Sequence, residues 1–290
     1  MCTGSAEANH SVKIIQDISE MHDIAAHLRQ KGKTIGFVPT MGSLHQGHLS
    51  LMEHAKKETD IVIVSIFVNP VQFGPKEDFN QYPRDMEGDT EKTRSAGADI
   101  LFTPTSSGIY PEGFKTYVSV EVLSEIMCGK TRPGHFSGVS TVVLKLLNIV
   151  KPHMAFFGQK DFQQTVIIKR MVKDLNVDVN IIVLPTIRET DGLAMSSRNQ
   201  YLDKEERRAA TILYRALKKG QSLFESGNKG AEKLREIISH SFQEEPSAHL
   251  EYLAIVHPET LEEEKEVCKG TLIAIAAHIG KTRLIDNIIL

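Results

Sequence analysis

Two hydrophobic patterns alternate along the first two thirds of the chain. Short, continuous apolar runs, several of them rich in β-branched residues, occupy residues 34–38, 60–69, 99–102, 154–158 and 180–184. Such runs are typical of strands that are buried on both faces of a sheet. Apolar side chains recur at helical spacing between and before them, and predict helices at residues 18–30, 49–57, 87–96, 138–151 and 162–175. The alternation over residues 33–185 predicts an α/β fold with a doubly wound parallel sheet.

Weaker patterns complete this first region. Residues 12–18 suit a short strand or a lead-in, and residues 117–122 alternate like an edge strand. Residues 123–129 suit a helical turn, and residues 132–136 read as a loop. Residues 1–10 are polar and predict a loose tail.

The pattern changes after a polar stretch at residues 188–199. Asp203 and Glu206 have the spacing of a capping box, and the helix that they begin has one apolar face through Leu217. A second helix is predicted at residues 231–242, followed by strands at 252–256, 271–276 and 284–288. We therefore place a boundary near residues 186–199, with a larger domain at 1–188 and a smaller α+β domain at 189–290.

Composition places the chain among ordinary globular proteins. Hydrophobic residues make up 41% and charged residues 24%, and 34 basic against 37 acidic residues give a net charge of -3. This balance argues against broad electrostatic binding to nucleic acid. The cysteines Cys2, Cys128 and Cys268 form neither a disulfide framework nor a zinc pattern. No signal peptide is evident, and the apolar stretches are far shorter than the roughly 20 residues of a membrane span, so we expect a cytoplasmic protein.

The first candidate site is the glycine-bearing loop P-T-M-G-S-L-H-Q-G-H at residues 39–48, between a predicted strand and a predicted helix. A helix start offers unpaired backbone N–H groups and suits an anion, and glycine lets the backbone approach it. His45 and His48 would both lie near this start. The alternative interpretation of such a pair is two histidines in a surface loop.

A second loop, F-G-Q-K-D at residues 157–161, repeats the arrangement of strand, glycine and helix start. Lys160 would stand at the positive end of a helix dipole, which is unfavourable unless an anion is bound there. The alternatives are a solvated surface lysine and, for Asp161, a simple helix cap.

The string M-S-S-R at residues 195–198 lies within the proposed boundary. Two hydroxyl groups and the planar donor fork of Arg198 suit a polyphosphate, although such a string alone is more often an ordinary loop. Gln72 and Gln164 offer neutral amides, which hold a nucleophilic carboxylate without the stabilisation of an ion pair. Asp89 is the candidate Mg²⁺ ligand, and its alternative role is an exposed acidic residue at a helix start.

Together these strings resemble the pantoate–β-alanine ligase (pantothenate synthetase) family of the nucleotidylyl transferase superfamily. The superfamily is recognised by H-x-G-H at the end of its first strand, and the longer P-T-M-G-x-L-H-x-G-H points to the family. F-G-x-K-D-x-Q-Q and M-S-S-R follow in the family's order. The resemblance implies a Rossmann-like fold, a homodimer, and ATP-dependent ligation of (R)-pantoate and β-alanine through a pantoyl adenylate.

The resemblance also implies roles for the residues at the matching positions. His45, His48, Lys160, Ser196, Ser197 and Arg198 are the expected catalytic residues, with His48 as the proton donor. Gln72 and Gln164 are expected to bind pantoate, and Gln72 also to contact β-alanine. The positions expected to bind ATP are Pro39, Thr40, Met41, Gly42, Ser43, Leu44, His45, Gln46, Gly47, His48, Gly158, Gln159, Lys160, Asp161, Ile187, Met195, Ser196, Ser197 and Arg198.

Departures from the family's usual string are small. Ser43 stands where alanine is common, Gln46 and Gln159 where glutamate is common, and Phe162 where tyrosine is common. Two rival functions remain: a nucleotidyltransferase that transfers AMP to a phosphate, and a nucleotide-binding module without catalysis. The two glutamines argue against the first, and Lys160 with the Ser-Ser-Arg loop argues against the second.

Overall fold

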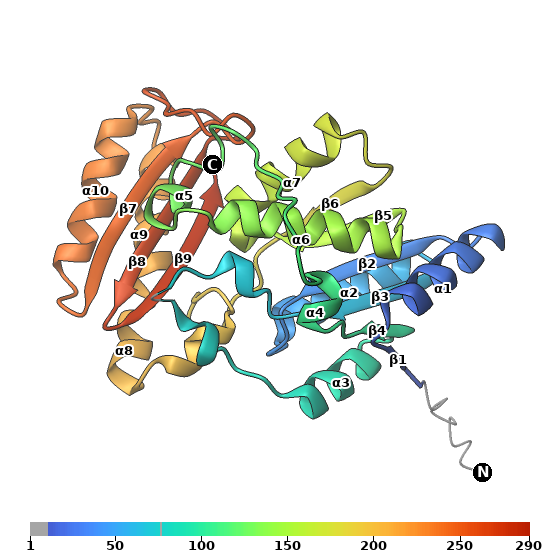
Figure 1. The fold of residues 1–290 in the computed structure, drawn as a ribbon. Coiled ribbons are helices and arrows are strands. Elements are labelled where there is room, and N and C mark those ends of the chain that lie inside the picture. The colour runs from blue at the N-terminus through green and yellow to red at the C-terminus, as the bar shows by residue number, and fades with distance from the viewer. Residues whose placement is uncertain (1–10, 76) are drawn as a thin grey trace, which may run out of the picture.

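The computed structural model describes residues 11–75 and 77–290. The expected tail at residues 1–10, which includes Cys2, lies outside this part of the chain. Two sheets make up the framework and stand on opposite sides of the molecule (Figure 1). One is a six-stranded parallel sheet from the first two thirds of the chain, and the other is a three-stranded antiparallel sheet from the last fifth.

The parallel sheet has the strand order β1-β4-β3-β2-β5-β6. Its strands are β1 (Lys13–Ile15), β2 (Ile35–Thr40), β3 (Ile61–Ile66), β4 (Ile100–Phe102), β5 (Met154–Gly158) and β6 (Asn180–Leu184). The helices of this region are α1 (Ile18–Gln30), α2 (Gln46–Glu58), α3 (Met86–Ser95), α4 (Ser106–Ile109), α5 (Cys128–Thr131), α6 (His135–Val150) and α7 (Phe162–Asp174). The predicted doubly wound sheet is confirmed.

Burial on both faces explains why the strands are continuously apolar. Phe37 of β2 packs in one cluster with α1, α6 and α7, whereas its neighbour Val38 packs in another with α2. Successive side chains of a strand point to opposite faces, so β2 to β6 contribute to both clusters, whereas the edge strand β1 buries only Ile15. The sheet therefore lies between two helical layers, and its carboxyl edge is left for the loops.

The C-terminal part has one core of its own, made of buried residues between Leu193 and Leu284. It contains α8 (Lys204–Ala209), α9 (Ile212–Glu225), α10 (Ala231–Gln243), β7 (Ala248–Val256), β8 (Leu272–Ile279) and β9 (Thr282–Ile289). Two smaller clusters join the parts, because Val166 and Ile167 of α7 pack with residues of the antiparallel sheet.

Three sequence predictions were wrong in detail. Residues 117–122 form no strand, because the N–H of Val118 is taken by Thr141 Oγ1 of α6 (2.9 Å). Val118 and Val120 pack on the core, whereas Tyr117 and Val122 are exposed. Helix α6 begins three residues early, at His135, within the expected loop. The helix beyond the confirmed Asp203–Glu206 capping box is broken into α8 and α9 where the N–H of Thr211 bonds to Arg208 O (3.3 Å).

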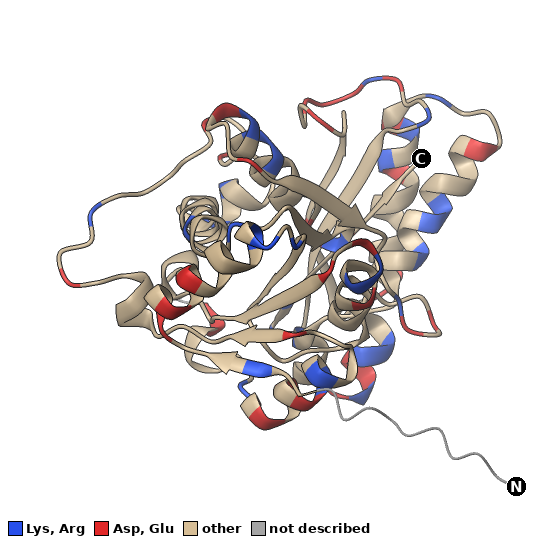
Figure 2. Cartoon of the chain, turned by 90° about the vertical axis from the view of Figure 1, so that its right-hand side faces the viewer, with Lys and Arg blue, Asp and Glu red and all other residues tan. Residues whose placement is uncertain are grey.

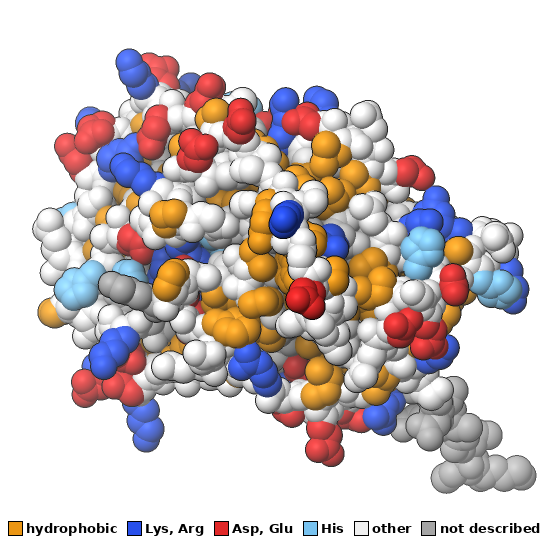
Figure 3. All heavy atoms as spheres, in the orientation of Figure 1, with side chains coloured by type: hydrophobic (Ala, Val, Ile, Leu, Met, Phe, Trp, Pro, Cys, Tyr) orange, Lys and Arg blue, Asp and Glu red, His pale blue; other side chains and the backbone are white. Residues whose placement is uncertain are grey.

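Surface charge is mixed. Lysine, arginine, aspartate and glutamate alternate over the helices and loops in Figure 2, without a face of one sign in that view. Hydrophobic side chains gather across the centre of the face in Figure 3, and charged side chains of both signs surround them. Within residues 11–75 and 77–290, no helix combines the length and apolarity needed to cross a bilayer.

Candidate active site

A cleft with two compartments lies at the carboxyl edge of the parallel sheet. The smaller compartment, about 230 Å³, is lined by the loop after β2, and the larger, about 730 Å³, is lined on one side by β8 and β9. The compartments are adjacent, since they share a set of lining residues: Arg132, His135, Lys160, Asp161, Gln164, Ser196 and Arg198. Ligands of open α/β sheets bind at this edge.

The loop at residues 39–48 is held from outside the cleft by Asp89. Both oxygens of this buried carboxylate accept backbone N–H groups, from Ser43 and from Leu44, each at 2.7 Å. Gly42 has a φ of 82°, and a Cβ there would lie 2.9 Å from Asp89 Oδ2. Only glycine tolerates this combination of backbone angle and close approach.

Asp89 therefore does not lie where a ligand of Mg²⁺ in the cleft was expected. It lines neither compartment, and its oxygens are committed to the loop rather than turned toward a metal. Among residues 11–75 and 77–290, no group of three or more His, Cys, Asp or Glu residues could hold a metal ion. The oxygens of Asp89 thus do not fit the expected role of a Mg²⁺ ligand.

His45 and His48 meet at the start of α2, with ring centroids 4.1 Å apart. His45 is the N-cap, and its Nδ1 accepts the N–H of Gly47 at 3.2 Å. The Nδ1 of His48 accepts the N–H of His45 at 3.3 Å. A nitrogen that accepts a hydrogen bond carries no proton, so the proton of each neutral ring is on Nε2.

Both rings are neutral at pH 7. Burial, with a further contribution from the charge of Lys160, lowers the pKa of His45 to about 4. Burial and then the neighbouring His45 hold the pKa of His48 well below its usual value. His48, the proton donor expected from the resemblance, is thus a neutral imidazole in this structure. Each imidazole offers an Nε2–H hydrogen-bond donor rather than a transferable proton.

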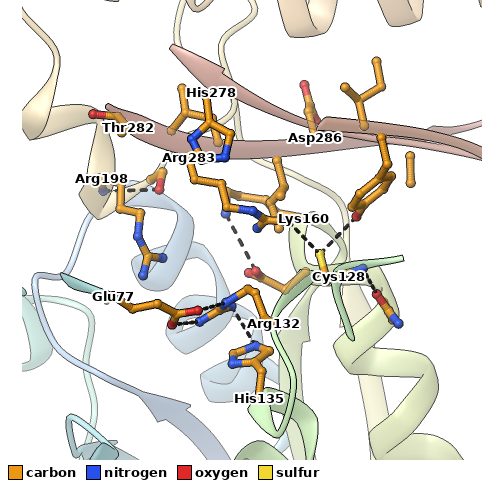
Figure 4. A pocket seen from close by; sticks show the side chains of 18 of the residues that line it. Glu77, Cys128, Arg132, His135, Lys160, Arg198, His278, Thr282, Arg283 and Asp286 are labelled. Atoms are coloured by element: carbon orange, nitrogen blue, oxygen red, sulfur yellow. Dashed lines mark hydrogen bonds and ion pairs between the residues drawn. The ribbon is translucent and has the colours of Figure 1, made fainter. Parts of the chain in front are cut away.

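Lys160 lies in the single turn η3 (Gln159–Asp161) between β5 and α7 and lines both compartments. Its Nζ is 3.8 Å from Asp161 Oδ1. The close-up in Figure 4 places Lys160 beside the strand that carries Arg283 and Asp286. The ammonium group therefore faces the cleft from between the two sheets.

The Ser-Ser-Arg loop closes the cleft from the side of η4 (Ser197–Tyr201). Ser196 caps that turn, and Ser197 Oγ lies 3.2 Å from Tyr82 OH. Arg198 forms two hydrogen bonds with Asp78 of the turn η2 (Asp78–Asn80), at 2.9 and 2.8 Å. Two of the guanidinium donors of Arg198, which were expected to bind a polyphosphate, are thus hydrogen-bonded to the carboxylate of Asp78.

The two glutamines also reach the cleft. Gln72, in the turn η1 (Pro70–Gln72), donates to Met41 Sδ at 2.9 Å and accepts from Asn69 at 3.1 Å. Gln164 lines both compartments, and its amide has no hydrogen-bond partner among the described residues. Sulfur is a weak acceptor, so a better ligand displaces it readily.

The comparisons with known proteins decide the family. A match to Pantoate-beta-alanine ligase extends over residues 13–289. The chain belongs to the pantoate–β-alanine ligase family. It is 56% identical to the pantothenate synthetase of Thermodesulfovibrio yellowstonii (93% of this chain, 96% of that protein) and 53% identical to that of Caldicellulosiruptor bescii (95% and 98%).

Solved structures of the same family agree. The pantothenate synthetase of Thermus thermophilus superposes with a TM-score of 0.91 at 44% identity, over 96% of this chain and 99% of that one. The ligase of Francisella tularensis, complexed with beta-gamma ATP and beta-alanine, gives 0.79 at 39% identity, over 96% and 98%. The Rossmann-like fold expected from the sequence is confirmed.

Sequence reasoning missed a second charged group in this ligase. Arg132 forms two hydrogen bonds with Glu77, at 2.7 and 2.6 Å, and a third with His135 Nε2 at 2.9 Å (Figure 4). His135 donates from Nδ1 to Gln72 O at 2.8 Å, and burial and then Arg132 lower its pKa to about 4. The sequence feature that could have revealed this group is the arginine and the histidine in the loop at 132–136, directly before an apolar helix.

Proposed function

We propose that this chain ligates (R)-pantoate and β-alanine into pantothenate, with ATP converted into AMP and pyrophosphate. The observation that carries the proposal is the shared cleft: two neutral imidazole donors, one ammonium group and two amides face the same compartment. This set suits a reaction in which a carboxylate attacks a phosphorus atom and charge builds on phosphate oxygens.

In the first step, a carboxylate oxygen of pantoate attacks the α-phosphorus of ATP, and the bond to the pyrophosphate oxygen breaks. The Nε2–H groups of His45 and His48 and the ammonium group of Lys160 donate to the oxygens that gain charge. Neutral donors held by backbone N–H groups need no reorganisation during the step. The products are pantoyl adenylate and pyrophosphate.

Binding of ATP uses the three loops of the cleft. We assign residues 39–48, 158–161, Ile187 and 195–198 to the nucleotide, and Ser196, Ser197 and Arg198 to its leaving phosphates. Two hydrogen bonds hold the guanidinium group of Arg198 against Asp78. Phosphate binding therefore includes exchange of one anionic partner of Arg198 for another.

Pantoate is assigned to Gln72 and Gln164. Amide groups orient a carboxylate and hydroxyl groups without an ion pair, so the carboxylate keeps its nucleophilicity. Displacement of the weak Gln72–Met41 contact costs little, and Gln164 has no partner to give up among the described residues.

In the second step, the free amine of β-alanine attacks the carbonyl carbon of the adenylate, and AMP leaves with the electrons of the broken C–O bond. The larger compartment, about 730 Å³, gives β-alanine room beside the smaller one. Closure of the cleft would shield the adenylate from water. We assign residues 1–188 and 189–290 to two domains that enclose it, and the separate core between Leu193 and Leu284 supports this division.

Mg²⁺ would be held mainly by the phosphates of ATP. No step above depends on it. By analogy with the family, we propose a homodimer in the cytoplasm.

The test is pantoate-dependent exchange of pyrophosphate into ATP without β-alanine. Exchange that requires pantoate supports the adenylate, and addition of β-alanine should then divert the reaction to AMP and pantothenate. Exchange with a phosphate acceptor instead of pantoate would identify a nucleotidyltransferase. Nucleotide binding without any turnover would leave a binding module.

A further inference from the structure

The turn that carries Lys160 is held by a side chain from the last strand of the protein. Asn287 of β9 donates from Nδ2 to Gln159 O at 3.0 Å and to Lys160 O at 2.9 Å. Its Oδ1 accepts from Gln159 Nε2 at 3.2 Å. One amide thus bonds twice to the backbone of this turn and once to its side chain.

These bonds use both N–H groups of the Asn287 amide, and the side chain is buried, with 2% of the residue exposed. The orientation of the amide is therefore fixed by its partners. Aspartate has nearly the same shape but lacks both donors, and would set a carboxylate oxygen against two carbonyl oxygens.

Asn287 itself stands on a rigid support. The adjacent residue, Asp286, forms two hydrogen bonds with Arg188, at 2.6 and 2.9 Å, and the guanidinium stacks on Tyr214 at 4.1 Å. Arg188 also donates to Asn287 O at 3.3 Å. A bidentate pair with an aromatic face beneath it allows little movement of the strand at this point.

The turn has little else to hold it. Its N-cap is Gly158, which has no side chain that could hydrogen-bond to the turn. A Cβ built on Gly158 would meet no atom within 4 Å. The Nζ of Lys160 lies 3.8 Å from the carboxylate of Asp161, too far for a hydrogen bond. The position of the ammonium group thus depends on where the backbone of the turn is fixed.

We propose that Asn287 is a positioning residue for Lys160, through which the C-terminal sheet sets the distance between the ammonium group and the reacting phosphate. The inference rests on the proposed function, because it takes Lys160 to act on ATP. A displacement of about 1 Å at such a group can lower a rate by roughly 100-fold.

The experiment measures pyrophosphate exchange in Asn287→Ala, Asn287→Asp and the matched control Ile289→Ala, an exposed residue of the same strand that lines neither compartment. We expect both Asn287 variants to lose about 10- to 100-fold in the rate constant at saturation, with the KM for pantoate unchanged. Ile289→Ala should exchange pyrophosphate at the wild-type rate. Unfolding midpoints measured alongside should fall in Asn287→Asp, because its buried carboxylate faces two carbonyl oxygens, so exchange is compared at a temperature at which every variant is folded.

A double-mutant cycle with Lys160→Ala separates positioning from general support. If Asn287 acts through Lys160, its replacement should cost no more than about twofold once Lys160 is absent. The same loss in both backgrounds, or wild-type exchange in both Asn287 variants, would overturn the inference. Wild-type exchange in Lys160→Ala would instead remove the proposed role of Lys160, and this inference with it.

Discussion

The histidine loop and the arginine pair, Arg132 and Arg198, line the same cleft but are prepared for ligands in opposite ways. The two imidazoles are neutral, and their Nδ1 atoms accept backbone N–H groups, so their Nε2–H groups are left for a ligand. The two arginines are charged and already paired with Glu77 and Asp78. One region is preorganised, whereas the other must exchange partners.

The difference follows from where each group stands. At a helix start, buried donors are held by the backbone, and neutrality avoids the cost of a desolvated charge. A guanidinium group cannot give up its proton, so in a partly buried cleft it retains a carboxylate until a phosphate replaces it. Four perturbations test whether the histidine loop is preorganised and whether the arginine pair exchanges partners.

Loss of an imidazole should have the largest effect. His48→Ala removes one Nε2–H donor from the reacting centre, so we expect pantoate-dependent exchange to fall by about 100-fold or more. The matched control is His54→Gln on the same helix, outside the lining of both compartments. Exchange within about threefold of wild type in His48→Ala would exclude the histidine loop from the chemistry.

The preorganisation itself depends on Asp89. Asp89→Ala leaves the buried N–H groups of Ser43 and Leu44 without their acceptor, so the free energy of unfolding should fall by about 2 kcal/mol and exchange by roughly tenfold. Chemical denaturation and the exchange assay measure the two effects. Glu87→Ala, which removes an exposed carboxylate from the same first turn of α3, is the control. Equal effects in both variants would contradict the role given to the carboxylate.

A weaker carboxylate partner for Arg198 should improve the binding of ATP rather than impair it. Asp78→Asn weakens the partner that phosphate must displace from Arg198, so the KM for ATP should fall by about three- to tenfold. Glu77→Gln loosens Arg132 and leaves the bond of Arg198 intact, so it serves as the control. A raised KM in Asp78→Asn would mean that Asp78 orients Arg198 rather than competing for it.

The smallest effect concerns pH. With the pKa of His45 lowered to about 4, exchange should be flat from about pH 8 to about pH 6 and decline only toward about pH 4. An inflection near about pH 6.5 that vanishes in His45→Asn would show that the ring is not neutral as described.

The lowered pKa values of the buried histidines should also make the free energy of unfolding depend on pH. Between about pH 6.5 and about pH 4, His45 and His135 are protonated in the unfolded chain but stay neutral in the folded chain, because folding lowers their pKa values to about 4. The free energy of unfolding should therefore fall as the pH drops from about 6.5 to about 4, and urea titrations at several pH values measure this slope. His135→Asn should make the slope shallower, and an unchanged slope would contradict the depressed pKa of His135.

The sequence by itself determined the elements whose pattern is local. The helix at residues 18–30 and the strands at 154–158 and 180–184 have the predicted bounds, because burial on one or both faces dictates their periodicity. The glycine loops between strands and helices were also identified, together with the family to which they belong.

Tertiary structure decided what depends on distant partners. Residues 117–122 have the alternation of a strand but find a helix side chain instead of a neighbouring strand. Asp89 serves a loop more than forty positions earlier in the chain, and Asn287 reaches Lys160 across a separation of 127 positions. Desolvation, which makes the histidines neutral, likewise arises only when segments pack together. Periodicity encodes which face is buried, whereas charge state and partner choice arise from which segments meet.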